Sequence, residues 1–140
     1  MIPLEKRFNN KGESYIEAAV LVLAGTFFLV FCLSVFEFLI QKQKLDFFAK
    51  ELVETAAAYG TTAGPAEERY VNLCNRLGIA PVCDYSGTDY YDQSREAVQL
   101  GEEISLELTL SNSMGIAGLF SFPVTITARS SGLSQQYWKQ

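Results

Sequence analysis

The stretch that decides the fold is NKGESYIEAAVLVLAGTFFLVF, residues 10–31, in which the charged Glu17 stands directly before the longest apolar run of the chain. Residues 18–36 carry no formal charge and are rich in Leu, Val and Phe. A helix of that length measures about 28 Å at roughly 1.5 Å per residue, which is close to the hydrocarbon thickness of a bilayer. The run therefore predicts one transmembrane segment, at about residues 18–40.

The helical pattern continues beyond this segment, through QKQKLDFFAKELVETAAAYG, residues 41–60. Apolar residues recur there at spacings of three and four, which indicates one buried face: Leu45, Phe48, Ala49, Leu52, Val53 and Ala56. Gly60 is a plausible stop just past the last turn. We therefore expect one helix over residues 13–60, apolar all round in its first half and one-sided in its second half.

The remaining residues, 61–140, change from helical to strand periodicity. Pro65 suits the first turn of a second helix, and Gly78 suits its end. Residues alternate between apolar and polar in EISLELTLS (103–111) and VTITAR (124–129), and less clearly in PVCDYS (81–86), which predicts strands. The expected fold is α+β: a long N-terminal helix, a short helix and a small antiparallel β-sheet with one face against the long helix.

Between the two clear strands lies an apolar connector, NSMGIAGLFSF, residues 112–122. The sequence leaves two interpretations of residues 114–122 open. The connector is either a loop that caps the core or a surface that docks on a membrane or a partner.

Charge is distributed unevenly along the chain. Residues 1–12, interpreted as a disordered basic leader, carry three Lys and Arg against one Glu, a net charge of +2. Residues 46–140 carry six Lys and Arg against twelve Asp and Glu, a net charge of −6. Basic residues before an apolar span favour a cytoplasmic N-terminus in the cytoplasmic (inner) membrane, with residues 61–140 as a small extracytoplasmic domain. The lipid bilayer is then a partner, and the acidic outer domain argues against nucleic acid.

Candidate catalytic and metal-binding residues are few. The chain has no His, which removes Ser-His and Cys-His catalysis and the commonest zinc ligand. No phosphate loop or nucleophile elbow occurs, so we expect neither an enzyme, nor a metal, nor a cofactor. Cys32 is interpreted as filler within the span. Cys74 and Cys83 form either a disulfide, if the outer side is oxidising, or two buried free thiols.

KGESYIEAAVLVLAG (11–25) resembles the processing site of type IV pilin-like proteins: a basic leader, Gly12 at the cut, Glu17 five residues later and then an apolar helix. The chain is most similar to the TadE-type minor pilins of tight-adherence (Flp) systems. The similarity extends to the acidic-aromatic pair Glu37-Phe38, to ELVETAAAYG (51–60) and to the two strands around the apolar connector. An uncharacterised Gram-positive family of the same shape ends much like PVTITARSSGLSQQYW (123–138).

The resemblance implies that a prepilin peptidase cuts between Gly12 and Glu13, and that the product enters a pilus or secretion assembly with other pilin-like subunits and platform proteins. Filament-forming pilins commonly have a hydrophobic residue where this chain has Glu13. A carboxylate near hydrocarbon costs roughly 2.5–3.5 kcal/mol unless it is paired. After cleavage, Glu17 lies one turn from the new amine of Glu13 and can pair with it or with that of a neighbouring subunit.

Two alternatives remain open at this point. The chain can instead be an uncleaved single-pass accessory or binding protein of a conjugation or secretion apparatus, with Glu17 reaching the headgroups. Glu37 lies about 30 Å along the helix from Glu17. It is interpreted either as the outer membrane edge or as a packing contact with partner subunits.

Overall fold

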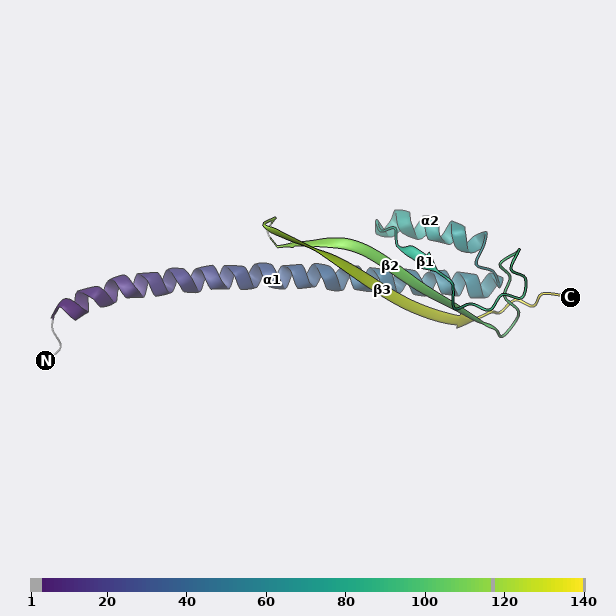
Figure 1. Cartoon of the computed structure of the whole chain (residues 1–140), viewed down its shortest axis with the longest axis horizontal. Coiled ribbons are helices and arrows are strands. Elements are labelled where there is room, and N and C mark those ends of the chain that lie inside the picture. The colour runs from purple at the N-terminus through teal and green to yellow at the C-terminus, as the bar shows by residue number, and fades with distance from the viewer. Residues whose placement is uncertain (1–3, 117, 140) are drawn as a thin grey trace.

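The computed structural model describes residues 4–116 and 118–139, and its most prominent feature is one very long helix (Figure 1). A second helix and a three-stranded antiparallel sheet lie against the C-terminal half of that helix. The elements follow the expected order: α1 (Leu4–Tyr59), α2 (Pro65–Leu77), β1 (Val82–Asp84), β2 (Glu103–Ile116) and β3 (Phe120–Leu133). The predicted α+β class is therefore confirmed.

α1 is longer than the sequence pattern predicted, because it begins at Leu4. Residues 4–12 were expected to be disordered, and this expectation is wrong for them. The first four of these residues, Leu4 to Arg7, are good helix formers. Extending an existing helix needs no new nucleus, which also carries the helix through the poorer formers Asn9, Asn10 and Gly12. Residues 1–3 of the expected leader lie outside the described residues.

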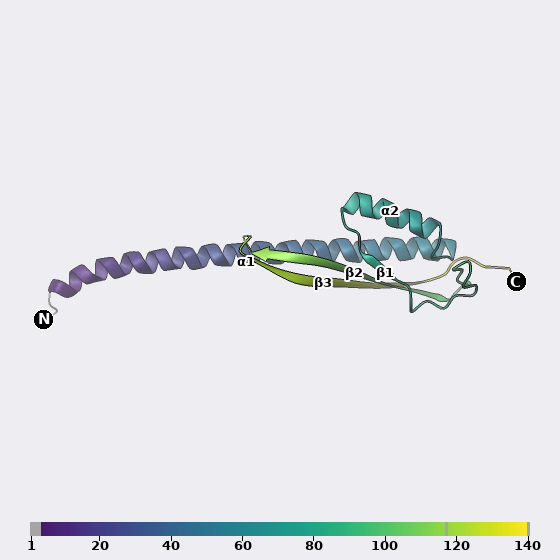
Figure 2. The same cartoon turned by 45° about the horizontal axis from the view of Figure 1, so that its top comes forward.

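The second half of α1 packs as its periodicity predicted. The six residues of the apolar stripe, from Leu45 to Ala56, are all fully buried. They form one core with Leu73 of α2 and with the alternate residues of β2 and β3 that face α1: Ile104, Leu106, Leu108, Ile126 and Ala128. Figures 1 and 2 show α1 running along the sheet, with α2 beside its C-terminal end. We call the second half of α1, together with α2, the sheet and the segments that connect them, the head (residues 41–116 and 118–139). The first half of α1 projects from the head.

The sheet has the order β1-β2-β3, with β2 in the middle. β1 pairs only with residues 107–109 of β2, whereas β2 and β3 pair along their full lengths, from Glu103↔Leu133 to Ile116↔Phe120. The apolar connector is therefore not a core-capping loop, and that interpretation is wrong. Its residues extend the two strands into a long hairpin because the alternation of the strands continues through them. The hairpin turns around Gly118, which has a positive φ of 71°.

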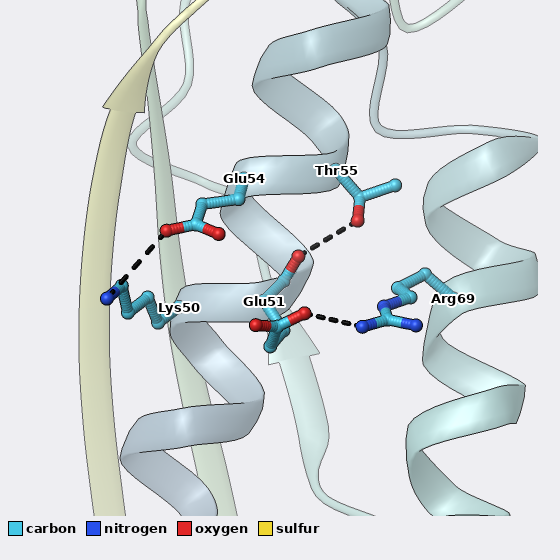
Figure 3. A network of polar contacts seen from close by, with 5 residues as sticks. All are labelled: Lys50, Glu51, Glu54, Thr55 and Arg69. Carbon is cyan, nitrogen blue, oxygen red and sulfur yellow. Dashed lines mark hydrogen bonds and ion pairs between the residues drawn. The ribbon is translucent and has the colours of Figure 1, made fainter.

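Two ion pairs on adjacent turns of α1 differ in their surroundings (Figure 3). The half-buried Glu51 accepts a hydrogen bond from Arg69 of α2, so this pair joins the two helices. Lys50 and Glu54 lie 3.9 Å apart on the exposed side of α1. An exposed pair within one helix contributes about 0.3–0.5 kcal/mol, whereas hydrogen bonds to charged groups contribute about 1.5–3 kcal/mol. Of these two pairs, Glu51–Arg69 is therefore the stronger and the one that stabilises the contact between α1 and α2.

The C-terminal segment closes the end of α1. Gln135 donates from its backbone to the carbonyl of Ala57 at 2.8 Å, and the indole of Trp138 donates to the carbonyl of Gly60 at 3.1 Å. A Cβ at Gly60 would lie 2.5 Å from Cβ of Gln136 and 2.9 Å from Nε1 of Trp138. Gly60 is thus required both for its positive φ of 64° and for this close approach.

We expect Gly60→Ala to lower the free energy of unfolding by about 2–4 kcal/mol, because backbone strain and a steric clash add. The matched control is Gly78→Ala. Gly78 has a similar φ of 67° in the left-handed helical conformation but open space around its Cβ position, so this change should cost only about 1 kcal/mol. Denaturant unfolding of the full chain in detergent, followed by circular dichroism, measures both values. Equal losses in the two variants would contradict the packing of the C-terminal segment on Gly60.

Candidate membrane-spanning and assembly surface

The first half of α1 exposes its apolar side chains in every direction. It contains a window with a mean hydropathy of 2.6, of which only 6% is buried. The largest exposed residues include Leu21, Phe28 and Leu29. A helix that is apolar all round needs an apolar environment on all sides. The length, composition and exposure of this segment fit a single-pass membrane protein in which a lipid bilayer surrounds it.

The residues of the predicted processing site lie on this exposed half. α1 continues without a break through Gly12 and Glu13, and a Cβ at Gly12 would meet no atom within 4 Å. Glu17 is exposed one turn further on, and no ion pair of the described residues includes it. Glu37 is also exposed, near the end of the apolar segment. Gly12, Glu13 and Glu17 therefore lie on the helix outside the head, whereas Glu37 lies on the helix next to Phe38, which packs against the core. The structure brings none of the four together with Cys74 or Cys83.

Two polar contacts tie the β2–β3 hairpin to α1 just beyond the apolar segment. Asn112 donates from its amide to Oε1 of Gln41 at 2.6 Å. Lys42 donates to the backbone carbonyl of Thr127 and to Asp46 on the next turn of its own helix. Sequence reasoning missed this junction. The available signal was Asn112, the one polar residue at a helix-facing position of β2, together with the polar run QKQK at residues 41–44.

Cys74 and Cys83 lie in the head, between α2 and β1, and both are free thiols in the structure. Burial, followed by the neighbouring Cys74, raises the pKa of the Cys83 thiol to about 11. Burial also raises the pKa of the Tyr70 hydroxyl to about 12, helped by a hydrogen bond with Cys74. Of the two alternatives for Cys74 and Cys83, the structure therefore contains the free thiols. The disulfide stays a prediction, because two cysteines are joined or separate according to the redox state of the compartment.

An open groove of about 520 Å³ lies beside these residues, lined by α2, β1 and the segment around Tyr85 and Glu96. Burial raises the pKa of Tyr85 as well. At neutral pH, Tyr70, Cys83 and Tyr85 are therefore protonated and uncharged, which makes them weak nucleophiles and weak bases. Among the described residues, no group of three or more acidic or sulfur ligands could hold a metal ion.

The raised pKa of Cys83 predicts slow alkylation. Its ordinary value is 9.0, so a value of about 11 leaves about 100-fold less thiolate near pH 8, and the rate with iodoacetamide should fall by a similar factor. Mass spectrometry of reduced, folded protein measures the rate at Cys83. The urea-unfolded chain is the control, because burial is lost there. An alkylation rate that does not change on unfolding would contradict the burial of this thiol.

Comparison with known proteins adds one finding. A family model described as "Domain of unknown function (DUF4320)" matches residues 22–139, and the chain therefore belongs to this family. The match takes in most of α1 and the whole head, and it begins after Gly12, Glu13 and Glu17. No curated protein and no solved structure matches the chain.

Proposed function

We propose that this member of the DUF4320 family is a minor pilin or pseudopilin similar to the TadE type. In this proposal the protein is a structural subunit, held in the cytoplasmic membrane by residues 18–40 with its head on the extracytoplasmic side. It packs through the exposed half of α1 into a pilus or secretion assembly. The observation that carries the proposal is the unbroken helix Gly12–Tyr59, of which one half is buried in its own head and the other half is exposed and apolar.

The continuity of α1 supports a subunit more than a simple anchor. An anchor requires only an apolar span, and a flexible linker between span and head would serve it equally well. Here the span and the core stripe belong to one helix, with no proline within its described length. Any rotation or displacement of the span is therefore transmitted to the head. Such stiffness suits a protein whose position is set by helix packing in an assembly.

The position of Glu17 supports the same proposal through its charge. A carboxylate at the edge of hydrocarbon is costly unless a cation is close, and the head provides none to Glu17 among the described residues. A cut after Gly12 would create an ammonium group at Glu13, one helical turn away. Pairing within the chain or with the next subunit would offset part of the cost and would set the packing of neighbouring helices.

A second candidate is an uncleaved accessory protein of a conjugation or secretion apparatus. Two observations favour it. α1 begins at Leu4 and runs through Gly12 without a break, so a peptidase would have to unwind its first turns. The family match also begins after the processing site.

The mature N-terminus separates the two candidates. In cells with an active prepilin peptidase, we expect the intact mass of a chain that begins at Glu13. Gly12→Val should retain residues 1–12, whereas the matched change Gly25→Val should be processed normally. Both glycines are helical with open space at their Cβ positions, so neither change should disturb the fold. A wild-type chain that keeps Met1 in working protein would refute the pilin-like proposal.

Charge pairing is tested separately with Glu17→Ala. We expect this variant to be cut after Gly12 but to enter assemblies poorly, because the amine of Glu13 loses its partner in the apolar environment. The measurement is the fraction of mature chain that co-purifies with its assembly, and Glu54→Ala, on the exposed face of the head, is the control. Unchanged co-purification of Glu17→Ala would remove the pairing argument and leave the cleavage argument standing.

A further inference from the structure

The row of β3 side chains that faces α1 remains apolar where the core ends. Along this row, Ala128 and Ile126 are buried and Val124 is half-buried. The next two members, Phe122 and Phe120, are 54% and 58% exposed. The two largest side chains of the row, both phenylalanines, thus lie where the cover provided by the protein is lost. A surface built in this way needs an apolar environment from outside the chain.

The exposed end of the row lies beside the apolar segment of α1. Asn112 is bonded to Gln41, so the hairpin residues beyond it extend toward the N-terminal half of α1. Both views of the molecule show the hairpin reaching further in that direction than any other part of the head (Figures 1 and 2). Ser34, on the same side of α1 as Phe38 and Gln41, is only 8% exposed. Ser34 lies about 5 Å along the helix on the membrane side of Glu37.

The tip also lacks charge. No Asp, Glu, Lys or Arg occurs from Leu108 to Ala128. The first charged residues on the two strands are Glu107 and Arg129, which are register partners and form an ion pair of 2.9 Å. Charged residues therefore end at one level of the hairpin, and only apolar and small polar residues continue toward the span. Such a sharp boundary is typical of a surface that meets a membrane interface.

We propose that the tip of the β2–β3 hairpin, residues 113–116 and 118–122, is a second membrane contact that enters the outer leaflet beside α1. The occupant of this surface is lipid, because the surface is continuous with the segment of α1 that a bilayer surrounds. Phe120, Phe122 and Leu119 provide the apolar contact, and Ser113 and Ser121 bond to headgroups or water. The proposal requires that α1 spans a membrane, but it requires neither cleavage after Gly12 nor a pilus.

Backbone pairing sets the depth of this contact. In the part of the chain that the structure describes, β3 has no partner on its outer edge, and β2 has none on its β1 side beyond Thr109. Unpaired backbone groups are not tolerated in the hydrocarbon core, where no water can bond to them. The tip therefore rests at the boundary between headgroups and acyl chains, to a depth of about 5–10 Å, as interfacial elements do.

Photocrosslinking tests the contact on the full chain in vesicles. The vesicles contain phosphatidylethanolamine and phosphatidylglycerol with an alkyne-tagged acyl chain. p-Benzoylphenylalanine replaces Leu119 or Phe122 at the tip, and Phe28 in the span as the positive control. The matched control is Leu133, which is exposed and apolar like Leu119 but lies at the opposite end of β3. After irradiation, tagged lipid on the protein is measured by gel fluorescence and mass spectrometry.

We expect lipid adducts at positions 119 and 122, with a yield comparable to that at 28, and background at 133. Adducts at 28 alone would overturn the proposal. Adducts of positions 119 and 122 with a second copy of the chain instead of lipid would also overturn it, because the surface would then be a subunit interface. Two tip positions are used, so a local disturbance of the hairpin at one of them does not decide the result. The outcome is independent of the mature N-terminus, so this proposal and the pilin-like function can fail separately.

Discussion

The structure depends on one helix that must be covered along its whole length by two different environments. From Leu45 to Ala56, α1 is covered by α2 and the sheet through one buried stripe. From residue 18 to residue 33, it is apolar all round and nearly uncovered by the protein, as a bilayer requires. Since no break separates the two halves, the position of the head follows from the position of the span. The hairpin, the junction and the closing C-terminal segment are all arranged relative to this helix.

The sequence predicted those parts of the fold that depend on local periodicity. The stripe of α1, the stop at Gly60 and the alternating strands are set by residues close in the chain, and all were found as expected. The first turns of α1 were missed because basic composition was taken for disorder, although residues 4–7 are good helix formers and the helix that follows needs no new nucleus to extend through them. The apolar connector was missed because its role depends on register. Only the pairing of Met114 with Phe122 and its neighbours shows that these residues extend a hairpin.

The candidate site was predictable in part, for a related reason. The exposed apolar helix and the positions of Gly12, Glu13 and Glu17 on it follow from sequence, because a helix of known period fixes which residues are neighbours. The contact of Asn112 with Gln41 joins residues 71 apart, and no local pattern contains it. Sequence therefore locates functional residues along an element, while the packing of the head decides which elements meet.

The junction at Gln41 and the hairpin tip together bear on how the head stands on the membrane. A single transmembrane helix leaves its rotation and tilt to its neighbours and to interfacial anchors. A hairpin bonded to α1 at Asn112 and Thr127, with its tip in the outer leaflet, supplies a second anchor on one side of the helix. When α1 rotates about its own axis, the hairpin moves with it. Lipid then covers Phe120 and Phe122 only in those orientations of α1 in which the hairpin faces lipid. In an assembly, the face of α1 opposite the hairpin would remain free to pack against other subunits. The hairpin tip would then set the orientation of the protein relative to the membrane, and the opposite face of α1 would bind its partners.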